Sequence, residues 1–115
     1  MVYDDELLKH VYAAFNARDL DAVLAALHAD VDWPNAWEGG RVHGHDGVRD
    51  YWTRQWAAMD PHVEPVGFAT DDAGRRVVTV HAIVRGLDGA IVSDGMVEHA
   101  YTFEGLIRRM DIQPA

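Results

Sequence analysis

Hydrophobic residues recur with a helical period in the first half of the chain. An i, i+3, i+4, i+7 spacing predicts an amphipathic helix over residues 4–18, formed by Leu8, Val11, Tyr12 and Phe15. Asp19 then suits the N-cap of a second short helix, whose apolar stripe runs from Leu20 to Leu27. A short strand near residues 31–33 follows. A third helix is predicted over about residues 46–59, with Val48, Trp52, Trp56 and Met59 on one face.

After residue 60 the hydrophobic period changes to two. Four strands are predicted, over residues 62–70, 75–87, 91–104 and 106–113. The segments "DDAGR" and "GLDG" and the glycine Gly105 separate them, and all three are typical of turns. Consecutive strands joined by short turns pair antiparallel. The expected fold is therefore α+β, with three helices packed on one face of a mostly antiparallel sheet.

The alternation within these strands assigns side chains to faces. In the segment 91–104, an inward phase holds His99 and Tyr101 among apolar neighbours. In the segment 75–87, His81 shares a face with Val77 and Ile83, and we expect it to point inward as well. The opposite face of that strand is also apolar, so both faces need cover. Helices cover one, and the simplest cover for the other is a second copy, which predicts a homodimer through the outer sheet face.

Composition and net charge limit the classes of binding partner that we expect. The 115 residues are expected to form one domain, 1–115, around a single core. A net charge of −9, from 19 acidic against 10 basic residues, argues against nucleic acid and anionic membrane surfaces. The chain has no cysteine, no apolar run of membrane-spanning length and no apolar leader segment, so a cytoplasmic location is expected.

Two histidines are the leading candidates for chemistry. His81 and His99 have ordinary pKa values near 6.5, so small changes of environment let either act as a neutral base or a charged acid. One can move a proton alpha to a carbonyl, or protonate a leaving hydroxyl, while the other stabilises the developing oxyanion. The alternative is that both are core histidines hydrogen-bonded to the backbone or to Tyr101.

Other residues are candidates for lining a pocket. Trp52 and Trp56 at helical spacing indicate core and pocket floor, and Gln55 beside them is either a surface residue or a polar anchor for a ligand. Tyr12 and Tyr101 are candidates for orienting a substrate. His62, at the start of a strand, is a candidate contact or simply exposed.

The stretch "VDWPNAWEGGRVHGHD", residues 31–46, carries further candidates. Trp33 and Asn35 are expected at the wall and mouth of a pocket. His43 and His45 can supply two metal ligands, but the glycine between them at a helix start favours a turn. Because a metal site needs a third ligand and a supporting shell, no metal is expected.

Three passages resemble the nuclear transport factor 2-like superfamily, which includes ketosteroid isomerase, scytalone dehydratase and the SnoaL-like polyketide cyclases. They are "VYAAFNARDLDAVLAALHADVDW", "HGHDGVRDYW" and "HAYTFEGLIRRMDI", and together they span nearly the whole chain. The resemblance implies a cone-shaped fold with a pocket between the helices and a strongly curved sheet. It implies no particular reaction, because the superfamily hosts several kinds of enzyme and also proteins without activity.

The resemblance also implies which residues of this chain occupy the functional positions of related enzymes. The general-base aspartate of the isomerases falls on Asn35, or on Trp33 after a small shift, their oxyanion-hole tyrosine falls next to Tyr12, and their buried acid falls on His99. Since neither Asn35 nor Trp33 is a usable base, isomerase chemistry in that form is not expected.

The dehydratases match somewhat better. Their two pocket histidines align with His62 and His81, and their pocket asparagine aligns with His99. Ala13 stands where their first helix carries an aspartate. Asn35 also aligns with an asparagine that holds water in the related epoxide hydrolases, whose arginine and aspartate partners are not recognisable here.

These observations lead to two hypotheses. The first is a cofactor-independent acid–base enzyme, a lyase, isomerase or cyclase, acting on a hydrophobic oxygenated small molecule. The alternative is a non-catalytic ligand-binding or dimerising accessory protein of the same fold. An open cavity holding the two histidines favours the enzyme, whereas a cavity filled by aromatic side chains favours the accessory protein.

Overall fold

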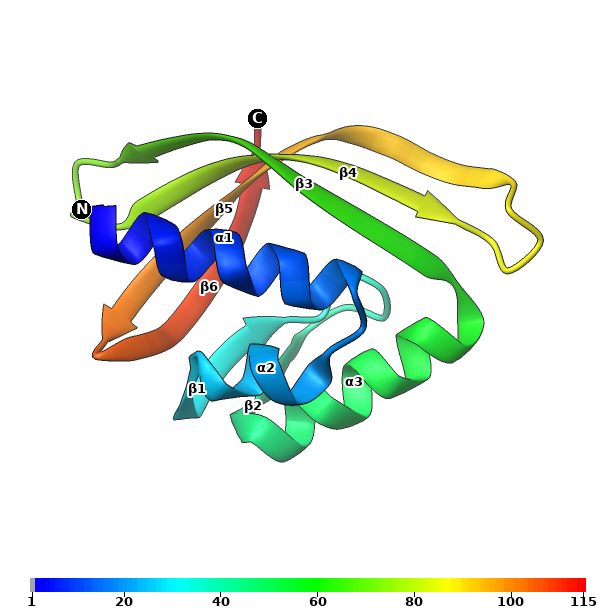
Figure 1. Cartoon of the computed structure of the whole chain (residues 1–115), viewed down its shortest axis with the longest axis horizontal. Helices are drawn as coiled ribbons and strands as arrows, with labels where there is room; N and C mark the ends of the chain where they lie inside the picture. Colours follow the sequence, from blue (N-terminus) through cyan, green and yellow to red (C-terminus); the bar gives the residue numbers. More distant parts are fainter. Residues whose placement is uncertain (1) are drawn as a thin grey trace.

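The computed structural model describes the backbone of residues 2–115 and the side chains of residues 5–115. Three helices precede most of a six-stranded sheet (Figure 1). The elements are α1 (Val2–Asn16), α2 (Leu20–Ala25), β1 (Leu27–Pro34), β2 (Arg41–His43), α3 (Gly44–Ala58), β3 (Asp60–Thr70), β4 (Arg76–Arg85), β5 (Ile91–Glu104) and β6 (Leu106–Pro114). None of these helices is long and apolar enough to cross a membrane.

The sheet has the strand order β2-β1-β6-β5-β4-β3. Strands β3 to β6 form the predicted antiparallel meander, and β6 then pairs in parallel with β1. The two halves of the chain therefore meet between β1 and β6, where Leu27 lies opposite Ile107. Bulges interrupt several ladders, and bulges bend strands, in keeping with the curved sheet of Figure 1.

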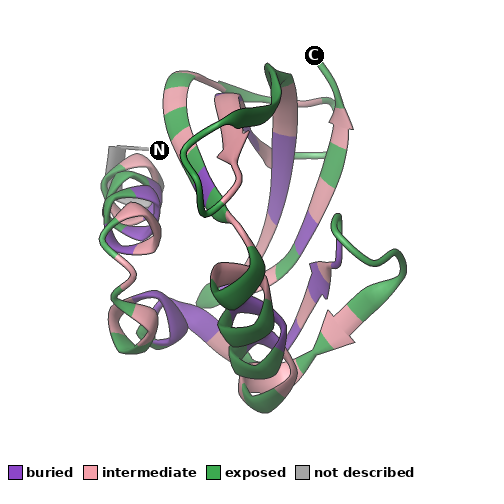
Figure 2. Cartoon of the chain, turned by 90° about the vertical axis from the view of Figure 1, so that its right-hand side faces the viewer, coloured by how far each residue is buried: buried purple, intermediate pink, exposed green. Residues whose placement is uncertain are grey.

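All three helices lie on the concave side of the sheet. Helix α1 packs mainly against β3 and helix α3 against β1. Buried residues fall on the surfaces that helices and strands turn toward one another, as Figure 2 shows by colour. Leu8, Val48, Val78 and Ile107 are fully buried in this core. The predicted α+β class, with helices on one face of a mostly antiparallel sheet, is confirmed.

Several predicted boundaries were wrong. The second helix ends before Leu27, which begins β1 instead, so the apolar stripe read as one helix belongs to two elements. Strand β2 was not predicted, because three residues rich in polar groups carry no alternation signal. The N-cap prediction is confirmed, since a carboxylate oxygen of Asp19 accepts a hydrogen bond from the Ala22 amide at 3.2 Å.

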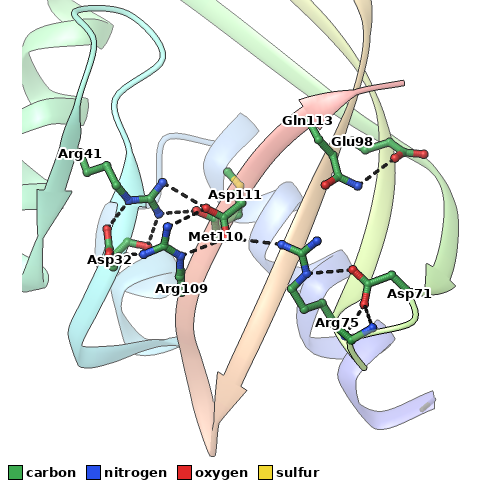
Figure 3. A network of polar contacts seen from close by, with 10 residues as sticks. Asp32, Arg41, Asp71, Arg75, Glu98, Arg109, Met110, Asp111 and Gln113 are labelled. Carbon is green, nitrogen blue, oxygen red and sulfur yellow. Dashed lines mark hydrogen bonds and ion pairs between the residues drawn. The ribbon is translucent and has the colours of Figure 1, made fainter.

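A network of charged side chains holds β2 and β1 to β6 on the convex face (Figure 3). Arg41 pairs with Asp32, donates to the Met110 carbonyl at 2.6 Å and reaches Asp111 at 3.3 Å. Arg109 binds the same two carboxylates, at 2.7 and 3.0 Å. The hydrogen bond from Arg41 lowers the pKa of Asp32, so this carboxylate stays charged across the neutral range.

Candidate functional site

A cavity of about 240 Å³ lies between α1, α3 and the concave face of the sheet. Its walls are mostly apolar or aromatic. The residues that line it are Val11, Tyr12, Phe15, Trp33, Pro34, Ala36, Tyr51, Trp52, Gln55, Pro61, Val63, Ala82, Val84, Val97, His99, Tyr101, Met110 and Ile112. Six predicted site residues are thus brought together: Tyr12, Trp33, Trp52, Gln55, His99 and Tyr101.

Three polar side chains meet on the wall between α1 and β5. The Tyr12 hydroxyl lies 2.8 Å from Nδ1 of His99 and 2.7 Å from the Tyr101 hydroxyl. Helix α1 supplies Tyr12 through its inward stripe, and the inward phase of β5 supplies His99 and Tyr101. All three residues are buried. Their hydroxyls and ring form one continuous hydrogen-bonded chain, which we call the tyrosine–histidine relay.

The relay fixes where the His99 proton sits. Tyr12 has one hydroxyl proton and two partners, so it donates to one and accepts from the other. If it donated to Tyr101, the Tyr101 proton would have no acceptor among the described residues. Either direction leaves one donor without a protein partner, and we place it on His99, which is 8% exposed, rather than on Tyr101, which is 1% exposed. Tyr101 then donates to Tyr12, and Tyr12 donates to Nδ1. The neutral ring then carries its proton on Nε2.

Burial keeps all members of the relay uncharged. Desolvation lowers the pKa of His99 from 6.5 to about 4, because the charged ring loses its hydration in this apolar site. Desolvation likewise raises the pKa of Tyr12 and of Tyr101 well above their ordinary value of 10. At neutral pH the cavity thus offers a neutral Nε2–H donor. No protein acceptor for this N–H occurs in the part of the chain that the structure describes.

Aromatic rings build the opposite wall. Trp33 from β1 and Trp52 from α3 meet edge to face at a ring distance of 5.4 Å. Tyr51 also lines the cavity and was not predicted. The inward face of α3 carries Val48, Tyr51, Trp52 and Gln55, an i, i+3, i+4, i+7 set, and this spacing was the signal that could have found it.

Trp56 lies outside this face. It packs on Phe15 and Trp52 and receives the Arg18 guanidinium over its ring at 5.2 Å. Its indole N–H is buried and has no hydrogen-bond partner among the described residues. Trp56 packs against the core as predicted, but it does not form the pocket floor, because the helix turns it toward α1 rather than into the cavity.

The expected inward position of His81 is wrong. Its neighbours on β4, Val80 and Ala82, point to the concave side, so His81 points to the convex side and its cross-strand partner is Met96. There its Nε2 lies 2.6 Å from a carboxylate oxygen of Asp94. His81 and His99 therefore lie on opposite faces of the sheet.

His62 is likewise turned away from the cavity. Its neighbours Pro61 and Val63 line the cavity, whereas the His62 ring lies 3.3 Å from Glu64 on the exposed face of β3. The predicted substrate contact at His62 is not compatible with this placement.

Asn35 organises its loop and does not line the cavity. Its side-chain oxygen accepts from the backbone amides of Trp37 and Glu38, at 3.2 and 2.7 Å, and its side-chain amide donates to the Glu38 carboxylate at 3.0 Å. The prediction that Asn35 contacts substrate is therefore wrong in this structure, because every polar group of its side chain already has a partner.

Replacing Asn35 with alanine is expected to lower the free energy of unfolding by about 1–3 kcal/mol, because two backbone amides lose their acceptor. Urea unfolding would measure the change. Glu38→Gln is the matched control, since glutamine keeps an amide oxygen that can accept from Asn35 and gives up only the half-exposed charge that pairs with Arg54. It is expected to change stability by less than about 1 kcal/mol. Equal effects of the two substitutions would contradict the organising role of Asn35.

The His-x-His pair does not form a metal site. His45 lies with Nε2 2.8 Å from the Leu27 carbonyl oxygen, so it joins the start of α3 to β1. Within the described residues there is no cluster of three or more histidine or carboxylate side chains that could hold a metal ion. Gly44, with a positive φ of 72°, makes the turn into the helix.

Comparison with known proteins supports the fold. The family described as SnoaL-like domain matches residues 8–110. No protein with a curated function matches the chain.

Three solved structures are similar along nearly the whole chain. A nuclear transport factor 2-like protein of unknown function from Burkholderia pseudomallei is 26% identical, with a TM-score of 0.84 over 100% of this chain and 92% of that chain. TerC, co-crystallised with polyporic acid, is 24% identical, with a TM-score of 0.80 over 96% and 89%. A putative polyketide cyclase from Sinorhizobium meliloti is 21% identical, with a TM-score of 0.78 over 94% of each chain. These similarities confirm the fold predicted from the sequence.

Proposed function

Because the chain belongs to the SnoaL-like domain family, we propose that it is a cofactor-independent enzyme of the lyase, isomerase or cyclase kind. Its substrate is a hydrophobic oxygenated small molecule that binds in the cavity. One observation carries this proposal: His99, kept neutral by its low pKa, lines a cavity with mostly apolar walls, and its Nδ1 is already paired with Tyr12, which leaves Nε2 for a ligand.

The proposed role of His99 is to bind a carbonyl oxygen of the substrate. When a proton leaves the carbon next to that carbonyl, negative charge develops on the oxygen, and the Nε2–H bond to it strengthens. Water takes the proton and returns it to the carbon, or the enolate attacks a second carbonyl of the same molecule and water returns the proton to the alkoxide that forms there. Tyr12 and Tyr101 are positioning residues, because they fix the ring and its proton without touching the substrate oxygen.

Two similar structures support a ligand of this kind. TerC was crystallised with the small molecule polyporic acid, and the Sinorhizobium meliloti protein is described as a putative polyketide cyclase. A small oxygenated ligand agrees with the apolar walls and the few polar side chains of this cavity.

Deuterium exchange into a simple ketone tests the proposal. β-Tetralone is a neutral aromatic ketone with exchangeable hydrogens next to its carbonyl, and its exchange in D₂O can be followed by proton NMR. The protein is expected to accelerate exchange above the buffer rate. Binding of β-tetralone without any acceleration would contradict the enzymatic proposal.

The second candidate is a ligand-binding protein without catalysis. It is favoured by the absence of any carboxylate among the described lining residues and by the low pKa of His99, which make a strong internal base unavailable. In that case Nε2–H would only hold a ligand oxygen. The exchange experiment separates the two, since both predict binding and only one predicts acceleration.

The convex face of the sheet is the proposed dimer interface. It presents the exposed side chain of Met96 beside His81, and Ile83 lies on the same face. We expect a second copy to cover this surface, as the apolar content of both strand faces indicates.

Met96→Glu is therefore expected to convert the dimer to a monomer, because it places a charge in an apolar contact. Sedimentation velocity would measure this. Leu87→Glu is the control, since Leu87 is also an exposed apolar residue but lies in the turn after β4. A wild-type protein that sediments as a monomer, or an identical response of both variants, would overturn the interface.

A further inference from the structure

A second hollow opens at the mouth of the cavity, and we call it the outer groove. It has a volume of about 330 Å³. Trp37 of the β1–β2 loop, Met59 after α3, and Val92 and Ser93 of β5 line it. Ala36, Gln55 and Val84 line both the cavity and the groove, so the two hollows share one wall. The groove lies toward the β4–β5 hairpin, which projects beyond the helices in Figure 1.

The cavity alone is small for a ligand site. Its volume of about 240 Å³ lies below the roughly 300–1,000 Å³ of typical small-molecule pockets. A ligand that reached His99 and filled the cavity would have its next atoms beside Gln55, at the junction with the groove. Ligand atoms beyond that point can pack on an apolar surface, because Trp37 and Val92 are 36% and 68% exposed.

Resting on the proposed function for the ligand site, we propose that the substrate is an elongated, uncharged molecule that occupies both hollows. One oxygen meets Nε2–H of His99, an apolar body fills the cavity, and an apolar tail passes Gln55 and covers Val92 in the outer groove. Gln55 is the specificity residue at the junction, because its amide can pair with a polar atom in the middle of the molecule.

Charge supports an uncharged ligand. None of the described residues that line either hollow is charged. A carboxylate or ammonium group buried there would lose its hydration without gaining a counter-ion. The polar side chains along the path are neutral: His99 in its uncharged form, Tyr12, Tyr51, Tyr101, Gln55 and Ser93. A charged group could be accommodated only at the end of the substrate that extends out of the groove into solvent.

Binding of para-alkylphenols, from ethyl to octyl, tests the proposal by calorimetry. The phenol oxygen suits the His99 donor, and the alkyl chain measures how far the apolar path extends. Affinity is expected to rise about fourfold for each methylene that becomes buried. The rise should continue past the length that fills the cavity, as the tail enters the groove.

Val92→Asp is expected to lower the affinity for the octyl compound about sixteenfold, equivalent to two buried methylenes, and to leave the ethyl compound within about twofold. The matched control is Ile91→Asp, since Ile91 is also exposed, adjoins Val92 on β5 and lines neither hollow. It should leave both affinities unchanged.

Three results would overturn the groove: no gain from ethyl to octyl, equal effects of the Val92 and Ile91 variants, or no binding by any member of the series. A change of sedimentation with Val92→Asp would also do so, because Val92 would then belong to a contact between copies. The enzymatic proposal is judged separately by ketone exchange, so either proposal can fail while the other holds.

Discussion

His99→Phe is expected to slow the protein-catalysed exchange of β-tetralone about 10²- to 10³-fold, the usual effect of removing one oxyanion donor. Phenylalanine keeps a flat ring in the same place and removes the Nε2–H group. The relay loses its acceptor at Nδ1, but Tyr12 and Tyr101 can still pair with each other. Proton NMR in D₂O measures the rate, with saturation by ketone separating turnover from binding.

His81→Phe is the matched control for this substitution. Both residues are histidines of neighbouring strands, but His81 lies on the convex face with Asp94. Its replacement should leave the exchange rate within about twofold, since it touches neither the ligand nor the relay. A large loss with His81→Phe and none with His99→Phe would reverse the assignment and contradict the site described above.

His99→Gln sharpens the assignment further. Glutamine retains an N–H donor but cannot titrate, so a donor role predicts partial activity and a proton-transfer role predicts none. Tyr12→Phe should reduce the rate less than His99→Phe, because it releases the ring from its fixed orientation while keeping the imidazole. The donor role also predicts that the contribution of His99 is constant from neutral pH down to about pH 4, where the ring becomes charged.

Acidification is expected to destabilise the protein through His99 by an amount on the order of 3 kcal/mol. The pKa of this ring is about 4 in the folded protein and 6.5 ordinarily. Between these values the unfolded chain binds a proton that the folded chain does not, so stability falls as the pH falls. The contribution is present in full above pH 6.5, is lost progressively toward about pH 4, and changes no further below it.

Urea unfolding at about pH 7 and about pH 4.5 would measure this effect. The wild type should lose more stability than His99→Phe over this interval, and the difference between them isolates the ring from all other titrating groups. His81→Phe retains the buried His99 ring, so the part of its stability loss that comes from His99 should equal that of the wild type. An identical pH dependence of wild type and His99→Phe would show that His99 is not held neutral by burial.

The sequence was sufficient for the fold, because periodicity directly reflects which residues are buried. Leu8, Val11 and Tyr12 are buried in α1 as their spacing predicted, and His99 and Tyr101 share the inward phase of β5. In each case one phase of the pattern is clearly more apolar or aromatic than the other.

The same reasoning failed for His81, where both phases of the strand are apolar. Val77 and Ile83 on one face balance Val78 and Val84 on the other, so alternation alone does not decide which face is concave. Pairing with β5 decides it, since His81 lies opposite Met96 and not opposite an inward residue. The tyrosine–histidine relay could not be predicted from the sequence either, because the two residues that Tyr12 contacts lie 87 and 89 positions away.

Sheet order has a consequence for the way the chain reaches its native state. Strand β6 lies between β1 and β5, and it is both the last strand along the chain and the one that joins the two halves of the sheet. Before β6 is in place, β1 and β2 have no contact with the meander through backbone pairing. The wall that carries Met110 and Ile112 is also missing. Pairing across some 80 residues is slow compared with hairpin formation, so during synthesis the concave site becomes complete only after the segment 106–114 has left the ribosome.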